Sequence, residues 1–115
     1  MSNLKLPAVT NLSSAWGWLD RNKGDHFAYR TSLRFANGGR DITVRHHSTD
    51  IITYEGDGSI TLNSGGWWSS TTRNRMDRLT PDWLRVRIRD FTLEVSVNGG
   101  PFEHLHDGAN FSPVA

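Results

Sequence analysis

Cysteine is absent from the 115-residue sequence, so neither a disulfide framework nor a thiolate metal site is possible. Long apolar runs are absent too, because none approaches the roughly 20 residues that a helix needs to span a bilayer. The N-terminal stretch MSNLKLPAVTNLSS lacks the continuous apolar segment of a signal peptide. The formal net charge is only +1. Together with a length that fits one domain, these absences favour a single cytoplasmic domain over residues 1–115 with no membrane partner.

Charged and aromatic residues are distributed unevenly along the chain. All eleven Arg lie between Arg21 and Arg89, and after Arg89 there are four acidic residues but no Lys or Arg. A basic middle and an acidic end predict either one polar binding face or charges that pair across strands. The five Trp must in part fill the core of so small a domain. Stacking on bases or sugars is the alternative for one or two of them.

Turn signals recur at short intervals and separate short runs of β-branched and aromatic residues. This spacing favours an antiparallel meander of about seven strands. One short helix near residues 69–80 interrupts the strands, which makes the fold class α+β. The turn signals lie at residues 37–39, 56–58, 64–66 and 98–100.

Strand registers are predicted by asking which turns bring apolar residues together. A turn at Asn37-Gly38 places Leu33 opposite Ile42. A three-residue loop over 56–58, with Gly58 in the left-handed conformation, places Tyr54 opposite Ile60 and Ile52 opposite Leu62. A two-residue turn at Asp57-Gly58 is rejected, because it would set Glu55 against Ile60.

The segment WLRVRIRDFTLEVSVNGGPF alternates cleanly between apolar and polar residues. A tight turn at Arg89-Asp90 pairs Ile88 with Phe91 and leaves arginines on the opposite face, with Arg85 opposite Glu94. A second turn, at Asn98-Gly99, brings Phe102 opposite Val95. The buried face is then predicted to comprise Leu84, Val86, Ile88, Phe91, Leu93 and Val95.

The helix candidate begins after an N-cap at Ser69, Ser70 or Thr71 and ends before Pro81. Thr72, Met76 and Leu79 fall on one face, which predicts that they pack on the sheet, and Arg75 and Arg78 are predicted to turn outward. Leu12, Trp16 and Leu19 also have helical spacing, although Gly17 between them disfavours a helix.

The stretch SGGWWSSTTRNRM combines a sharp glycine turn with a helix start, where free N–H groups and the helix dipole favour anions. It is no Walker loop, because no Gly-Lys-Ser/Thr follows at the required spacing. The bland alternative is a packed corner followed by an ordinary helix cap. The anion-, nucleic-acid- or partner-binding candidates are Ser69, Thr71, Thr72, Arg73, Arg75, Arg78 and Trp68.

Two histidine clusters contain residues typical of catalytic or metal sites. His46 and His47 are adjacent on a predicted strand, so they are expected to point to opposite faces and not to share a ligand. His47 and Asp50 are the catalytic candidates, although a half-buried His is more often structural. In HLHD, two His share a strand face and Asp107 could add a ligand, which makes His104, His106 and Asp107 the metal candidates. Because such spacing is common without metal, we expect neither metal nor cofactor.

The motifs HSTDIIT, ITLNSGGWWSSTTRNRM and PFEHLHDG together resemble the pattern of a family of small bacteriophage and mobile-element proteins. The resemblance runs over roughly residues 30–110, and its central block is the most specific part. The gap within EHLHDG is longer than the family's usual gap. The resemblance implies a genomic context and not a mechanism.

We therefore expect a non-enzymatic phage accessory protein in the cytoplasm of a bacterial host cell. It would bind nucleic acid, or an acidic or nucleoprotein host complex that handles nucleic acid. Inhibition of bacterial defence, in the manner of an anti-CRISPR protein, is one form of that role. The alternatives are a small metal-assisted hydrolase or nuclease and a minor virion component. Surplus Trp and an edge strand also make a homodimer plausible.

Overall fold

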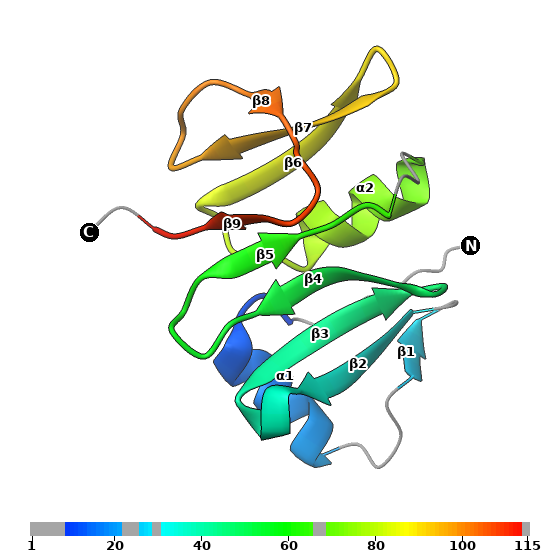
Figure 1. Cartoon of the computed structure of the whole chain (residues 1–115), viewed down its shortest axis with the longest axis vertical. Coiled ribbons are helices and arrows are strands. Elements are labelled where there is room, and N and C mark those ends of the chain that lie inside the picture. The colour runs from blue at the N-terminus through cyan, green and yellow to red at the C-terminus, as the bar shows by residue number, and fades with distance from the viewer. Residues whose placement is uncertain (1–8, 22–25, 29–30, 66–68, 114–115) are drawn as a thin grey trace.

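The computed structural model of the chain describes residues 9–21, 26–28, 31–65 and 69–113, which contain two antiparallel sheets and two α-helices (Figure 1). The predicted α+β class with mostly antiparallel sheet is confirmed. The helices are α1 (Leu12–Arg21) and α2 (Ser70–Arg78), with a 3-10 turn η1 (Asn37–Gly39). The strands are β1 (His26–Ala28), β2 (Thr31–Ala36), β3 (Asp41–His46), β4 (Thr49–Tyr54), β5 (Ile60–Leu62), β6 (Leu84–Arg89), β7 (Thr92–Val97), β8 (Glu103–His104) and β9 (Ala109–Phe111).

The larger sheet has the order β1-β2-β3-β4-β5-β9, so the last strand of the chain returns to pair with β5. The helix α1 packs against β2 and β3. At its start, Asn11 Oδ1 accepts a hydrogen bond from Ser14 N at 2.8 Å, and Ser14 Oγ accepts one from Asn11 N at 3.1 Å. This reciprocal cap starts the helix despite Gly17. Neither α-helix in the described residues is long and apolar enough to cross a membrane.

The smaller sheet has the order β6-β7-β8, and α2 joins it to the larger one because it contacts both β6 and β4. Figure 1 shows α2 between the two sheets. Tyr54 in the larger sheet donates a hydrogen bond of 2.5 Å from its hydroxyl to the carbonyl of Leu79, the residue that ends α2. Buried side chains from both sheets and both helices form a single hydrophobic cluster.

The predicted helix is confirmed, with Ser69 as its N-cap: the Ser69 hydroxyl accepts a hydrogen bond from Thr72 N at 3.1 Å. Thr72, Met76 and Leu79 are buried, as predicted. The helix ends where the Thr80 hydroxyl donates to the carbonyl of Met76 at 2.7 Å, directly before Pro81. A helix this short is stabilised mainly by its packing on both sheets.

The β4–β5 register is confirmed: Tyr54 pairs with Ile60, and Gly58 has a φ of +92° in a three-residue loop. The predicted β2–β3 register was wrong, because Leu33 lies opposite Val44 and not Ile42. Left-handed conformations at Asn37, Gly38 and Gly39 lengthen that turn to four residues. The turn is held by the buried Asp41, which accepts hydrogen bonds from Asn37 and, at 2.7 Å, from Gly56 N.

The β6–β7 register was also wrong by two residues. The turn is Asp90-Phe91, where both residues have positive φ, so Ile88 pairs with Leu93 and Arg87 with Glu94. A two-residue shift keeps every strand side chain on its predicted face, because the side-chain period is two. Phe91 is 90% exposed at the turn and not buried, and Ile88 is only partly buried.

The β7–β8 register differs by one residue, which moves a side chain to the other face. Val95 pairs with Glu103 and not with Phe102. The Phe102 ring therefore lies against the guanidinium of Arg87, 3.9 Å from the ring centroid. This cation–π contact occupies the polar face of the smaller sheet.

Candidate functional site

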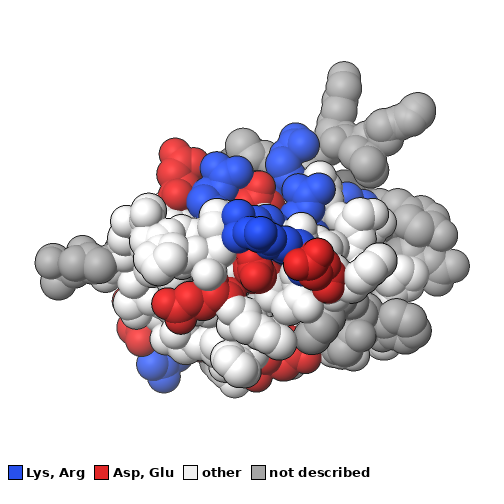
Figure 2. Space-filling view, turned by 90° about the horizontal axis from the view of Figure 1, so that it is seen from above, with Lys and Arg blue, Asp and Glu red and all other residues white. Residues whose placement is uncertain are grey.

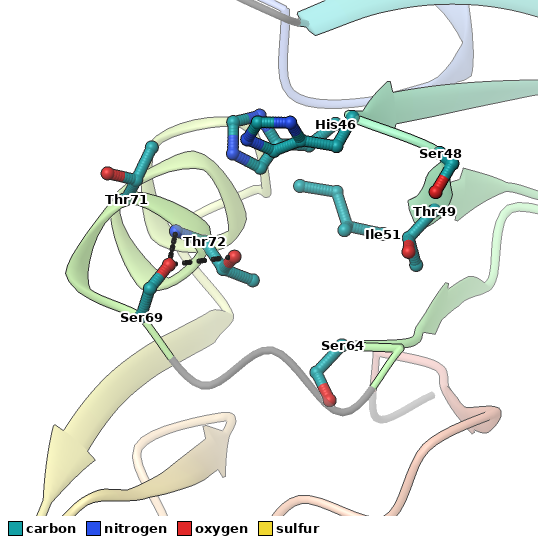
Figure 3. A pocket seen from close by; sticks show the side chains of 9 residues that line it. His46, Ser48, Thr49, Ile51, Ser64, Ser69, Thr71 and Thr72 are labelled. Carbon is teal, nitrogen blue, oxygen red and sulfur yellow. Dashed lines mark hydrogen bonds between the residues drawn. The ribbon is translucent and has the colours of Figure 1, made fainter.

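A polar pocket of about 500 Å³ lies between the β3–β4 turn and the N-terminal end of α2. Figure 3 shows Ser69 and Thr72 on the helix side, Ser48 and Thr49 on the opposite side, and Ser64 below them. Six of the nine described lining residues carry a hydroxyl, while Ile51 and the threonine methyl groups supply apolar surface. The residues that line this polar pocket are His46, His47, Ser48, Thr49, Ile51, Ser64, Ser69, Thr71 and Thr72.

The β3–β4 turn brings the two adjacent histidines together, contrary to the prediction that they point apart. β3 ends at His46, which pairs with Thr49, so only His47 and Ser48 form the turn. His47 has a φ of +57°, which breaks the strand alternation. The two imidazole centroids are 4.5 Å apart, with 72° between the ring planes. Both histidines therefore line the polar pocket.

His46 is 5% exposed, and its ring is held from the side of β2. Its Nδ1 lies 3.0 Å from the hydroxyl of Thr31, and this same hydroxyl accepts a hydrogen bond of 3.1 Å from Arg75 Nε. A hydroxyl that accepts from a guanidinium keeps its own proton to donate. Thr31 therefore links Arg75 of α2 to a histidine in the pocket wall.

Arg75 is 2% exposed, so the prediction that it turns outward was wrong. It lies three residues after Thr72 and four before Leu79, and this spacing puts it on the buried side of the helix. Its guanidinium contacts Thr31 and, at 3.3 Å, the amide oxygen of Asn74. It makes no ion pair with any carboxylate of the described residues. Burial lowers the pKa of Arg75 from its ordinary value, because a guanidinium is less stable away from water.

Three of the predicted binding residues lie together in the pocket wall: Ser69, Thr71 and Thr72. Ser69 donates from its hydroxyl to Thr72 Oγ1 at 3.1 Å while it caps the helix. The Thr71 hydroxyl is exposed and makes no hydrogen bond within the part of the chain that the structure describes. Trp68, also a predicted site residue, lies outside the described residues.

Ser64 forms part of the pocket wall, and Gly65 follows it and approaches Thr49 of β4. The Asp107 carboxylate accepts hydrogen bonds of 2.8 Å from both the backbone N–H and the hydroxyl of Ser64. Gly65 has a φ of +63°, and a Cβ there would lie 2.5 Å from the Thr49 hydroxyl. The close approach of Gly65 to Thr49 thus requires glycine.

The remaining catalytic and metal candidates are not gathered in the pocket. Asp50 does not line it and instead accepts a hydrogen bond of 2.9 Å from Arg45, so the predicted pair of His47 and Asp50 is not assembled. His104 and His106 stack on each other with centroids 5.1 Å apart. Within the described residues, no group of three or more His, Asp or Glu is arranged to hold a metal.

Five pocket residues were not among the predicted site residues: His46, Ser48, Thr49, Ile51 and Ser64. The sequence signal for the β3–β4 turn was the run of two histidines followed by Ser and Thr. The prediction of a continuous strand instead placed the two histidines on opposite faces. For Ser64, the sequence indicated only a turn. Its place in the pocket depends on Asp107, 43 residues away in sequence.

A second feature, the arginine face, extends along α2 and β6. It comprises Arg73 and Arg78 of α2 and Arg85, Arg87 and Arg89 of β6. Figure 2 shows one surface on which Lys and Arg side chains gather with Asp and Glu beside them. The two elements pack side by side. Asp77 of α2 accepts two hydrogen bonds from Arg85 of β6, at 3.0 and 2.9 Å.

Ion pairs divide the arginine face into two groups. Arg85 pairs with Asp77, and Arg87 pairs with Glu94 at 2.8 Å. Arg73, Arg78 and Arg89 make no ion pair with the described residues. Three cations are therefore available to an anionic partner.

The family model described as the Kyanoviridae Gp96 protein matches residues 19–111. This range includes every residue of the polar pocket and of the arginine face. No curated protein and no solved structure matches the chain.

Proposed function

The chain belongs to the Kyanoviridae Gp96 family of phage proteins, and from this premise we propose that it is a non-enzymatic accessory protein that binds nucleic acid through the arginine face. The family match confirms the phage resemblance drawn from the sequence motifs. The observation that carries the proposal is the packing of α2 beside β6, where Arg85 pairs with Asp77, because both elements carry further arginines without an ion pair in the described residues.

Guanidinium groups suit this role because they bind phosphate oxygens in a bidentate manner and keep their charge. Arg85 and Arg87 are already oriented by Asp77 and Glu94. Arg73, on the same side of the helix as Asp77, and Arg89, at the end of β6, extend this row, and Arg78 lies on the exposed side of α2. Such a surface would contact the sugar–phosphate backbone and carry little base specificity.

In the infected cell, this activity would place the protein in the bacterial cytoplasm, on nucleic acid or on a host complex that handles it. Inhibition of a bacterial defence complex is the form of this role that suits a phage accessory protein. The chemistry favours binding over hydrolysis, because Asp50 is paired with Arg45 and does not reach the polar pocket.

The proposal is tested by measuring affinity for DNA and RNA over a range of salt concentrations. If the three unpaired arginines each neutralise one phosphate, the slope of log K against log salt should be about −2.7 on duplex DNA. The double variant Arg78→Ala with Arg89→Ala should make that slope shallower by about two. A wild type without salt-sensitive affinity would exclude direct nucleic-acid binding.

The matched control is the double variant Arg34→Ala with Arg40→Ala. Both residues are exposed arginines on the β2–β3 hairpin, and neither makes an ion pair in the described residues. This control removes the same charge from another surface, so its slope should equal that of the wild type. The same mixtures, incubated with a divalent metal, should retain the nucleic acid without product. Metal-dependent cleavage would instead favour the nuclease alternative.

A further inference from the structure

The buried Arg75 points to an anion that comes from outside the chain. Charged side chains are seldom fully buried unless they are paired, because removing a charge from water is costly. Among the described residues, the partners of Arg75 are neutral: the hydroxyl of Thr31 and the amide oxygen of Asn74. The exposed arginines nearby, Arg85 and Arg87, both have carboxylates. Within the described residues, the buried Arg75 therefore lacks the counter-charge that the exposed Arg85 and Arg87 have.

The hydrogen bonds of Arg75 lead to the polar pocket. Its Nε donates to Thr31 at 3.1 Å, and the Thr31 hydroxyl lies 3.0 Å from Nδ1 of His46, which lines the pocket. An anion bound against His46 would lie two hydrogen bonds from the guanidinium, with the buried side chains of Thr31 and His46 between the two charges. Coulombic attraction through protein is stronger than through bulk water.

The lining of the pocket suits an anion as well. Two imidazoles and six hydroxyls line it, and no carboxylate is among the described lining residues. The hydroxyls of Ser48, Thr49 and Thr71 make no hydrogen bond within the described part of the chain, so all three can donate to a ligand. Figure 3 shows them on opposite sides of the cavity, with Ser48 and Thr49 at the strand turn and Thr71 on the helix.

We propose that the polar pocket binds a phosphate monoester of nucleotide size, with the phosphate held by His46 and the pocket hydroxyls above Thr31 and Arg75. The volume of about 500 Å³ exceeds what a bare phosphate needs and lies within the range of small-molecule sites. Either a free mononucleotide or the phosphorylated end of a nucleic-acid strand has this chemistry. The inference is independent of the arginine face.

The test compares ligands that differ only in the phosphate. Calorimetric titration with adenosine 5′-monophosphate and with adenosine should show at least about tenfold tighter binding of the monophosphate, since hydrogen bonds to a charged group are the stronger ones. An oligothymidine with a 5′-phosphate, compared with the same strand ending in a hydroxyl, tests the second source. Equal affinities within both pairs, or no binding of either phosphorylated ligand, would overturn the proposal.

Substitutions test whether the ligand binds in the polar pocket. Thr71→Val removes one pocket hydroxyl with little change of shape and should weaken monophosphate binding by about tenfold. Arg75→Met removes the buried cation and should weaken it at least as much. Ser70→Ala is the matched control, because Ser70 is the exposed neighbour of Thr71 and is not among the lining residues. Thermal unfolding of each variant checks that it is folded. If Thr71→Val and Arg75→Met are both folded and bind like the wild type, the site lies elsewhere and the pocket assignment is wrong.

The salt-slope experiment and this one can fail separately. A shallower salt slope in the variant Arg78→Ala with Arg89→Ala, with monophosphate binding intact, would support two distinct sites. A phosphate preference that disappears in the variant Arg78→Ala with Arg89→Ala, but not in Arg75→Met, would assign the phosphate to the arginine face and overturn the pocket proposal.

Discussion

Arginine side chains have opposite kinds of partner on the two sides of α2. On the exposed side, Asp77 makes a bidentate pair with Arg85 of β6. On the buried side, the partners of Arg75 within the part of the chain that the structure describes are a hydroxyl and an amide oxygen. An exposed ion pair contributes about 1 kcal/mol or less to stability, whereas an unpaired buried charge costs several. The buried side therefore carries the feature that stability alone does not explain, and its neighbour is the polar pocket.

The largest effect is expected where a charge is buried with no hydrogen-bond partners at all. Val86→Asp introduces a carboxylate at a buried position of β6, opposite Val95 and close to Asp77. We expect the free energy of unfolding to fall by about 4 kcal/mol, because nothing nearby compensates the new charge. Chemical denaturation measures it. Arg89→Asn, on the exposed face of the same strand, is the control and should change stability by less than about 0.5 kcal/mol. An unchanged midpoint for Val86→Asp would refute the placement of the β6 faces.

The next largest effect tests how α2 is tied to the larger sheet. Burial raises the pKa of the Tyr54 hydroxyl well above its ordinary value, and that hydroxyl donates to the carbonyl of Leu79. The native state then keeps its proton above pH 10, where the unfolded chain loses it. The stability from this group is complete below about pH 10 and falls by about 1.4 kcal/mol per pH unit above it.

The variant Tyr54→Phe isolates this contribution. At neutral pH it should lose about 1 kcal/mol, because the Leu79 carbonyl loses its donor. Above pH 10 the wild type should lose stability more steeply than the variant, by the one proton that Tyr54 retains. Denaturation curves from pH 8 to 11 measure both slopes. Parallel slopes for the two proteins would show that the Tyr54 hydroxyl is not buried as described.

The smallest effect sharpens the comparison between the two sides of α2. Arg75→Met replaces the buried cation by an apolar side chain, which removes a desolvated charge along with its two hydrogen bonds to neutral partners. We expect stability to stay the same or to rise by about 1 kcal/mol, because a buried charge without a carboxylate is a net cost. A loss of about 3 kcal/mol or more, measured by chemical denaturation, would make Arg75 a structural residue and remove the main support for an anion site.

How much of the fold could be predicted depended on whether a turn was specified locally. The β4–β5 loop was predicted correctly because Gly58 supplies the left-handed residue and only one register matches the apolar residues. The β6–β7 hairpin was not, since a shift of two residues leaves the apolar face unchanged and pattern alone cannot separate the two registers. The turn is instead Asp90-Phe91, with a bulky residue in a conformation that the sequence does not favour.

The candidate site was predicted in part for the same reason. Ser69, Thr71 and Thr72 follow from local capping chemistry, and all three line the polar pocket. The opposite wall depends on contacts that are distant in sequence, such as Thr31 with Arg75 and Ser64 with Asp107. The spacing of Arg75 from Thr72 and Leu79 favours the buried side of α2, although its charge favours the exposed side. No local pattern indicates that an arginine will be buried without a carboxylate.

The division of α2 into two functional sides is the central claim, and one binding experiment tests it most directly. A 5′-phosphorylated oligonucleotide and its 5′-hydroxyl form are titrated, over a range of salt, against Arg75→Met and against the triple variant Arg73→Ala, Arg78→Ala and Arg89→Ala. We predict that Arg75→Met loses the preference for the 5′-phosphate and keeps the salt slope. The triple variant should lose nearly all of the slope, which is about −2.1 for three phosphate contacts on a single strand, and keep the preference. If each variant loses both the 5′-phosphate preference and the salt slope, or if neither variant loses either of them, the two sides of α2 do not have separate functions.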